Sequence, residues 1–236
     1  ANAYGHGLLN ALAALQHADG LCVNSLDDAI CLRQAGWQGP LLLLSAYGLR
    51  PSDLADPCLG ELHLVIDAPD PLHALAQLQS NSPRLHAWLR YAGRLGGQGF
   101  EDSTYPAAFE QLQALLQARI IKQAGHLHHY AAAEDPQSLV EERQAFMQTV
   151  GKLPGPHSTG NSAALCGDLP EGIHKPGHWL RCGLLLYGAS ARPGCTGSQL
   201  GLRPAMHLRA RLTSVKRVKA GQTVGYRTRL DSQIGP

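Results

Sequence analysis

Residues 21–45, with the sequence LCVNSLDDAICLRQAGWQGPLLLLS, contain the alternation that decides the fold. The short apolar runs Leu21–Asn24 and Leu41–Ser45 are typical of buried strands, and the segment between them predicts a helix over Ser25–Gly36. A serine can cap this helix, two aspartates follow near the positive end of its dipole, and a glycine ends it. The stretch therefore predicts a strand–helix–strand unit of a parallel sheet.

The same alternation continues along most of the chain. Further strands are predicted at Leu62–Ile66, Leu85–Tyr91, Ala124–Tyr130, His157–Thr159 and Trp179–Cys182. Further helices are predicted at Gly7–His17, Asp70–Gln79, Tyr105–Ala118 and Gln137–Val150. A closed (β/α)8 barrel has one strand more than this pattern supplies. We therefore expect an α/β fold, a (β/α)8 TIM-type barrel missing its first strand, which would lie before Ala1.

The pattern changes after Arg203. Residues Met206–Thr213 alternate between apolar and polar side chains, as a half-buried strand does, and Lys219–Gly221 supplies a turn. We expect the barrel over residues 1–191, a linker rich in glycine and proline over 192–202, and the start of a C-terminal β-domain over 203–236.

Composition limits the classes of function. The net charge of +2 is too small to indicate a nucleic-acid groove or a membrane-surface patch, and no apolar run is long enough to cross a bilayer. The 6 cysteines form no C-x-x-C pair, which favours free thiols in a reducing compartment over a disulfide framework or a zinc site. We expect a cytoplasmic protein that binds neither nucleic acid nor membranes.

The chain opens with Ala-Asn-Ala-Tyr-Gly-His-Gly, and further motifs follow in a fixed order. They include Ser25-Leu26-Asp27-Asp28-Ala29, His129-Tyr130-Ala131, Asn161-Ser162-Ala163-Ala164, Arg181-Cys182-Gly183-Leu184 and Gly201-Leu202-Arg203-Pro204. In this order the motifs resemble those of the alanine racemases over nearly the whole chain. The resemblance implies a pyridoxal 5′-phosphate (PLP) cofactor, a small amino-acid substrate, and a homodimer in the complete protein.

The resemblance also implies which residues bind the cofactor. They are Tyr4, Asn161, Ser162, Arg181, Gly183 and Leu184. Hydroxyls and backbone N–H groups suit a dianionic phosphate, and the glycine lets the main chain approach it closely. Arg181 matches the arginine that faces the pyridine nitrogen, and a permanent guanidinium charge favours two-base proton exchange. The structural alternatives are a surface tyrosine for Tyr4, a simple turn for Gly183 and a salt bridge for Arg181.

A group of histidines lies near the end of the strand predicted at Ala124–Tyr130. His129 matches the family histidine that links Arg181 to a catalytic tyrosine, which is a supporting role. His126 and His128 should share the opposite face of the strand. Two ligands with no third do not predict a metal site, so we expect none here. For His126, hydrogen bonds to the backbone are the favoured interpretation.

Both catalytic bases are expected outside this sequence. In the family, the lysine that forms the Schiff base with PLP directly precedes the position of Ala1. The other base is a tyrosine in the β-domain of the partner subunit, and Tyr226 matches an earlier family position.

The interior also departs from the family. Arg90 stands where a lysine, often carbamylated, usually precedes a functional arginine. That arginine corresponds either to Arg94, which we expect to bind substrate, or, without gaps, to Gly97. The segment after Tyr226 lacks the usual glycines.

These features favour an amino-acid racemase that interconverts L- and D-alanine by two-base exchange of the α-proton. The alternatives are a catalytically inactive PLP-binding homologue or fragment and, less favoured, another PLP-dependent barrel enzyme.

Overall fold

A computed structural model describes residues 2–79, 85–94, 96–166, 177–207, 209–219, 221–224 and 228–229. The chain divides into two compact units, Ala1–Pro204 and Ala205–Pro236. Tyr226 lies outside the described residues. Within the described part, no helix is long and apolar enough to cross a membrane.

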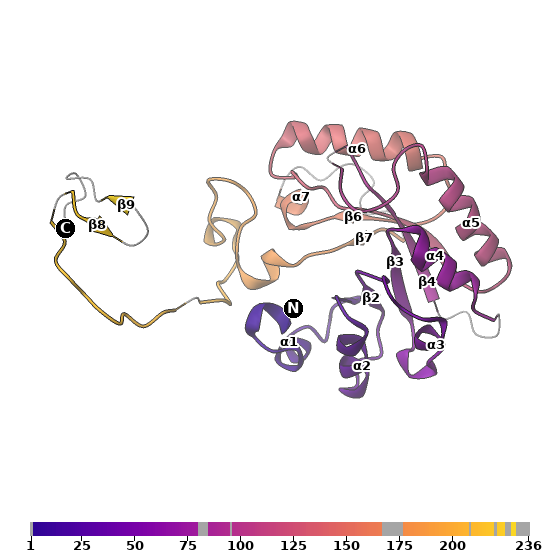
Figure 1. The fold of residues 1–236 in the computed structure, drawn as a ribbon, viewed down its shortest axis with the longest axis horizontal. Coiled ribbons are helices and arrows are strands. Elements are labelled where there is room, and N and C mark those ends of the chain that lie inside the picture. The colour runs from indigo at the N-terminus through magenta and orange to yellow at the C-terminus, as the bar shows by residue number, and fades with distance from the viewer. Residues whose placement is uncertain are drawn as a thin grey trace. The chain divides into compact units, whose positions relative to one another are not determined.

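The first unit is built on one curled sheet of seven parallel strands, hydrogen-bonded in the order of the chain (Figure 1). The strands are β1 (Leu21–Val23), β2 (Leu41–Leu43), β3 (Leu62–Ile66), β4 (Leu85–Tyr91), β5 (Gln123–His128), β6 (His157–Gly160) and β7 (Trp179–Leu180). All seven predicted strands are present; β3 and β4 have the predicted bounds, and the ends of the other five differ by one or two residues. The expectation of an incomplete (β/α)8 barrel is thus confirmed.

Helices lie along the outer side of the curled sheet (Figure 1). They are α1 (Leu8–Ala14), α2 (Leu26–Gln34), α3 (Pro51–Leu54), α4 (Pro69–Ala76), α5 (Tyr105–Gln117), α6 (Pro136–Val150) and α7 (Ser162–Cys166). The predicted cap of α2 is confirmed, because Ser25 Oγ accepts a hydrogen bond from Asp28 N at 3.1 Å. The short helices α3 and α7 carry too few residues for a helical period, so the sequence did not indicate them.

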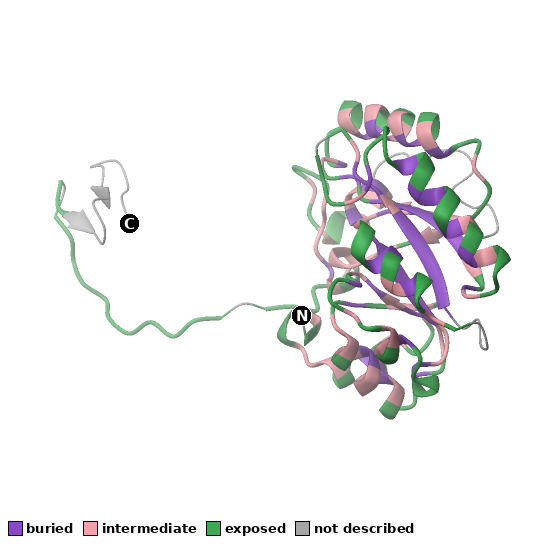
Figure 2. Cartoon of the chain, turned by 45° about the vertical axis from the view of Figure 1, so that its right-hand side comes forward, coloured by how far each residue is buried: buried purple, intermediate pink, exposed green. Residues whose placement is uncertain are grey.

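Figure 2 shows that the middle strands of the sheet, β3 to β5, are largely buried. Their side chains alternate between the two faces of the sheet. Toward the helices, leucines of β2 and β3 join apolar residues of α4 and α5 in the main core. Toward the inside of the curled sheet, Val65, Trp88 and Leu127 form a smaller cluster with Leu42 and Trp179 packed against it. Because strand side chains alternate, residues two apart from these also point inward. The inward positions therefore include His63, His86 and Arg90.

The second unit differs from the prediction. The expected strand Met206–Thr213 is irregular and exposed wherever it is described. The strands of this unit are β8 (Thr223–Val224) and β9 (Thr228–Arg229), which pair antiparallel. A two-residue alternation fits a strand only where a neighbouring strand satisfies the backbone and a core covers one face. Among the described residues, Met206–Thr213 pairs with no strand.

His126 lies on the outward face of β5, toward the helices. The ring is fully buried, Nε2 donates to Pro154 O at 3.2 Å, and Nδ1 lies 2.8 Å from Tyr105 Oη. His128 lies on the same face, in ring contact with Phe146 of α6. The interpretation of His126 as a core histidine bonded to the backbone is confirmed. Burial lowers the pKa of His126 from 6.5 to about 4.

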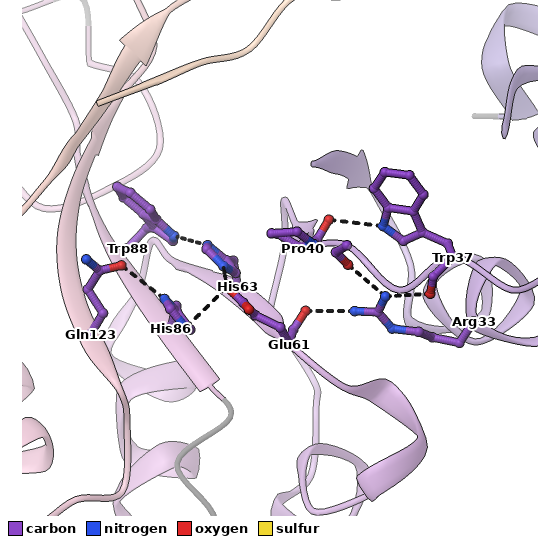
Figure 3. Close-up of polar contacts among 9 residues, drawn as sticks. Arg33, Trp37, Pro40, Glu61, His63, His86, Trp88 and Gln123 are labelled. Carbon is purple, nitrogen blue, oxygen red and sulfur yellow. Dashed lines mark hydrogen bonds and ion pairs between the residues drawn. The ribbon is translucent and has the colours of Figure 1, made fainter. Parts of the chain in front are cut away.

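Arg33 of α2 donates to four backbone carbonyl groups in two separate segments, and Figure 3 shows its contacts with Trp37 and Glu61. Its Nε donates to Leu59 O at 2.6 Å and its Nη2 to Glu61 O at 2.8 Å. Its Nη1 donates to the carbonyl oxygens of Trp37 and Gly39, both at 2.7 Å. This one guanidinium therefore fixes both the loop that leads into β2 and the segment that leads into β3.

We expect Arg33→Met to lower the free energy of unfolding by about 2–3 kcal/mol, because several partly buried carbonyl groups lose their donor. Arg50 provides the matched control, since its side chain is 77% exposed and pairs with Asp53 at the surface. Arg50→Met should leave stability nearly unchanged, because an exposed ion pair contributes little. Urea denaturation of both variants measures the difference, and equal effects would contradict the structural role of Arg33.

His126 should make stability depend on pH. The unfolded chain protonates this histidine below about 6.5, whereas the folded chain does so only near 4. The unfolded state therefore binds more protons in this window, and folding loses about 1.4 kcal/mol per pH unit as the pH falls. In urea denaturation from pH 7 to 4, His126→Gln should reduce this slope. The same change at the exposed His73 of α4 should leave it unchanged, and equal slopes for both variants would refute the assignment.

Candidate functional site

Most predicted site residues follow the carboxyl ends of two neighbouring strands. Asn161 and Ser162 come directly after β6, and Arg181 and Gly183 come directly after β7. In parallel barrels this end of the sheet carries the functional groups, because the loops there converge on one opening. The structure thus brings together residues that lie far apart in the sequence.

Two hydroxyl groups and a backbone N–H meet in this region. Gly183 N donates to Ser162 Oγ at 3.2 Å. A Cβ atom placed on Gly183 would lie 3.8 Å from Tyr4 Oη, which shows how close the tyrosine comes. The φ of Gly183 is −124°, so its backbone conformation does not require glycine. The missing side chain instead leaves space beside the two hydroxyls, and the next residue, Leu184, begins the short 3-10 helix Leu184–Tyr187.

Tyr4 is held in an unusual backbone conformation. Residues Asn2, Ala3 and Tyr4 all have left-handed φ values, of 48°, 51° and 54°. This region is costly for residues other than glycine and is often found at functional sites. Asn2 Oδ1 accepts a hydrogen bond from Leu8 N at 2.9 Å, and the Tyr4 ring contacts the Tyr187 ring edge-on at 4.9 Å. The side chain of Tyr4 is nonetheless accessible, with 58% of the residue exposed.

Asn161 positions its neighbour. Its amide nitrogen donates to Tyr130 O at 2.8 Å, and its Oδ1 accepts from Ala164 N at 2.9 Å. Both ends of the amide are therefore used, one to hold the loop after β5 and the other to cap α7. This arrangement fixes Ser162 at the start of that helix.

Arg181 ties three strands together. Its Nη1 donates to Ser158 O at 2.5 Å and to Ser158 Oγ at 2.6 Å, and its Nη2 donates to His128 O at 2.8 Å. A guanidinium has five N–H groups, and within the described part of the chain these bonds leave Nε–H and one N–H of Nη2 for another acceptor. Burial lowers the pKa of Arg181 to about 10, which leaves the side chain charged at neutral pH.

Two further basic side chains, His129 and Arg90, belong to this neighbourhood. His129 follows the last residue of β5, and burial together with the positive charges of Arg181 and Arg90 lowers its pKa. Arg90 points inward from β4, and its Nη1 donates to Gln98 Oε1 at 3.0 Å. In the sequence, Arg90 stands out only as a departure from the family. The alternation along β4 could have placed it inside the barrel with His86 and Trp88.

Arg94 lies against α6, away from the residues that follow β6 and β7. Its Nη1 pairs with Glu141 Oε2 of α6 at 3.0 Å, and its side chain is 58% exposed. Its backbone N donates to Glu142 Oε1 at 3.0 Å, while the other oxygen of that carboxylate lies 2.8 Å from the buried His128 Nε2. The alternative position, Gly97, donates its N–H to Ala92 O within the same loop. The structure does not bring Arg94 to Arg181, and its expected substrate contact stays a prediction.

A cavity of about 970 Å³ adjoins the site. Its wall includes Tyr4, Arg181, Gly183 and Tyr187, together with residues of α1 and β1. The cavity runs along β1 and β7, the two edge strands of the sheet, where the barrel is incomplete. The arrangement offers an anion two hydroxyls and a backbone N–H, and offers a neutral acceptor the remaining donors of Arg181.

Comparison with known proteins gives one consistent family. The family model for the alanine racemase N-terminal domain matches residues 1–191 of this chain. An alanine racemase of Bordetella avium is 39% identical over 230 residues, which cover 96% of this chain and 60% of that protein. One of Ralstonia nicotianae is 35% identical over 236 residues, covering 99% and 60%.

Solved structures agree. The biosynthetic alanine racemase of Pseudomonas aeruginosa superposes with a TM-score of 0.74 at 31% identity, covering 96% of this chain and 62% of that one. The alanine racemase of Acinetobacter baumannii gives a TM-score of 0.74 at 25% identity, covering 95% and 61%. The chain thus spans about 60% of the length of the curated relatives it matches. It belongs to the alanine racemase N-terminal domain family.

Proposed function

We propose that the protein is a PLP-dependent amino-acid racemase that interconverts L- and D-alanine. The observation that carries this function is the meeting of Tyr4 Oη, Ser162 Oγ and Gly183 N–H next to the charged Arg181. In a member of the alanine racemase N-terminal domain family, this set of groups suits the phosphate and the ring of PLP.

The phosphate fits the cluster chemically. A dianion needs several donors in a confined space, and hydroxyls and backbone N–H groups supply them. Ser162 Oγ, which accepts from Gly183 N in this structure, can turn its own hydrogen toward a phosphate oxygen. The space that a Cβ atom on Gly183 would occupy is available for the same anion.

Arg181 suits the pyridine nitrogen. PLP supplies an electron-withdrawing ring that acidifies the α-proton of a bound amino acid. Arg181 can donate one of its remaining N–H groups to the ring nitrogen and, being charged, gives up no proton to it. Proton transfer then depends on two bases on opposite faces of the substrate. We expect these bases at family positions outside residues 1–236, a lysine directly before Ala1 and a tyrosine of the partner subunit.

The proposed function also gives His129 a role and includes a homodimer. A neutral His129 beside Arg181 can accept a hydrogen bond from one partner and donate one to another, and so can connect the arginine with the partner's tyrosine. Its lowered pKa keeps it neutral at physiological pH. We expect the complete enzyme to work as a cytoplasmic homodimer.

Spectroscopy with an activity assay tests this function. The native protein, with its own flanking sequence, should change its near-ultraviolet and visible absorbance when PLP is added, and should racemise either enantiomer of alanine. D-alanine formed from L-alanine is measured by chiral chromatography. Absence of both signals would overturn the proposal.

A second candidate is a PLP-binding homologue without turnover. The ion pair of Arg94 with Glu141 favours it, because this pair directs the guanidinium toward α6. An absorbance change on PLP addition without racemisation of alanine would support this candidate over the first.

Gly183→Ala separates cofactor binding from folding. The new methyl group meets only Tyr4 Oη at 3.8 Å and the φ of −124° suits alanine, so the free energy of unfolding without PLP should stay the same. PLP should bind about tenfold more weakly or worse, because the methyl group occupies the space of the phosphate. Fluorescence titration measures the affinity. An unchanged affinity would place the phosphate elsewhere.

A further inference from the structure

Glu61, His63 and His86 gather at the amino ends of β3 and β4, away from the strand ends that carry the proposed PLP site (Figure 3). Glu61 directly precedes β3, and His63 and His86 are each the second residue of their strand. The register pairs the two histidines side by side, with ring centroids 4.2 Å apart. Their side chains are 5% and 8% exposed, so both rings are buried inside the curled sheet.

His86 has a buried nitrogen without a partner. Its Nδ1 lies 3.0 Å from Gln123 Oε1, and an amide oxygen only accepts, so Nδ1 carries the proton. In the neutral ring, Nε2 then presents a lone pair. This atom is buried with no hydrogen-bond partner in the described structure, and it lies 3.5 Å from Glu61 Oε1. The buried lone pair thus faces an oxygen of a partly exposed carboxylate, and a cation between the two would satisfy both.

His63 faces the same carboxylate oxygen. Its Nε2 lies 3.1 Å from Glu61 Oε1, and its Nδ1 accepts a hydrogen bond from Trp88 Nε1 at 2.9 Å. All three atoms, Glu61 Oε1, His63 Nε2 and His86 Nε2, lie within 4.8 Å of one another. Two imidazoles and one carboxylate form a donor set that suits zinc and the neighbouring divalent transition metals.

We propose that Glu61, His63 and His86 bind a divalent ion of the Zn²⁺ class, through Glu61 Oε1 and the two Nε2 atoms. Glu61 is 38% exposed, which gives the ion a path from solvent and leaves room for water as a further ligand. The hydrogen bond from His86 Nδ1 to Gln123 is the support that a metal-bound histidine usually has. The ion would join β3 and β4 to the segment that Arg33 holds.

Binding must rearrange His63. Because Trp88 donates to Nδ1, the neutral ring of His63 carries its proton on Nε2, and that proton has to leave before the metal can bind there. The proton moves to Nδ1 with no net change in protonation, and the Trp88 indole loses its acceptor. The stacked rings are also nearly parallel, at 9°, so they must tilt for their lone pairs to converge. Trp88 fluorescence therefore reports the ligation of His63.

Two positive side chains oppose the ion. Lys122 and Arg33 both act electrostatically on Glu61, and Lys122 also acts on both histidines. Arg33 is fixed by its backbone hydrogen bonds, whereas Lys122 is exposed. Removing the charge of Lys122 should strengthen metal binding, whereas it would do little for a site formed by other residues.

The test uses the native protein after treatment with a chelator. Calorimetry with Zn²⁺ should give one saturable site per chain, the visible absorption of Co²⁺ should show nitrogen and oxygen ligands, and Trp88 fluorescence should change in step. Glu61→Gln and His86→Gln should each weaken binding more than about 100-fold, since each removes a direct ligand. Lys122→Gln should strengthen it, and His73→Gln, at an exposed histidine, should not change it.

Gln123→Leu is the milder variant in case a ligand substitution prevents folding. It removes only the acceptor of His86 Nδ1–H and should weaken binding about 10- to 100-fold. Absence of saturable Zn²⁺ binding to the native protein would overturn the site. So would binding that survives Glu61→Gln, His86→Gln or Gln123→Leu unchanged, or a cluster that only takes up a proton as the pH falls. None of these measurements depends on PLP or racemisation.

Discussion

The buried guanidinium of Arg181 is the contact on which the candidate active site depends. It binds Ser158 of β6 and the carbonyl oxygen at the end of β5, while its own backbone continues β7. These three strand ends therefore have one fixed spacing. Asn161 and Ser162 follow one of them and Gly183 another, so the distance between the serine hydroxyl and the glycine N–H is set through Arg181. Arg181 therefore supplies both the positive charge of the candidate site and the spacing of the residues around it.

Alternation along the strands explains why one sheet holds two chemically different groups of residues. The outward positions of β3 and β4 are apolar and complete the core against the helices. The inward positions do not belong to that core, so they can carry polar side chains. Beside Trp88 they include His63, His86 and Arg90. Because the strands are parallel and in register, inward residues at the same height become neighbours, as His63 and His86 do. The position of an inward residue along its strand then decides whether it lies at the amino end or the carboxyl end of the barrel.

Much of the fold could be predicted from the sequence, because its signals are local. The strands and the longer helices have apolar periods, and the motifs around Asn161-Ser162 and Arg181 to Leu184 lie next to strand ends. The direction of Arg94 could not be predicted, since it depends on Glu141 and Glu142 of a helix some fifty positions later. The cluster of Glu61, His63 and His86 has no metal-site spacing and exists only through the register of two strands. Met206–Thr213 has the period of a strand, but among the described residues this exposed segment has no neighbouring strand to pair with.

The two ends of the barrel interior require ions of opposite sign. At the carboxyl ends, burial and the positive charge of Arg90 lower the pKa of Arg181, while Asp67 acts on Arg90 with the opposite sign. Arg90 also keeps a buried Nε–H without a hydrogen-bond partner in the described structure. Such a region is stabilised by a bound anion. At the amino ends, a carboxylate faces the unshared lone pair of His86, and a cation is needed. A cavity of about 50 Å³, lined by His63, Trp88 and Arg181 among others, lies between the two. Alternation along one parallel sheet therefore places two positive side chains at one end of the barrel interior, and a carboxylate with two imidazoles at the other.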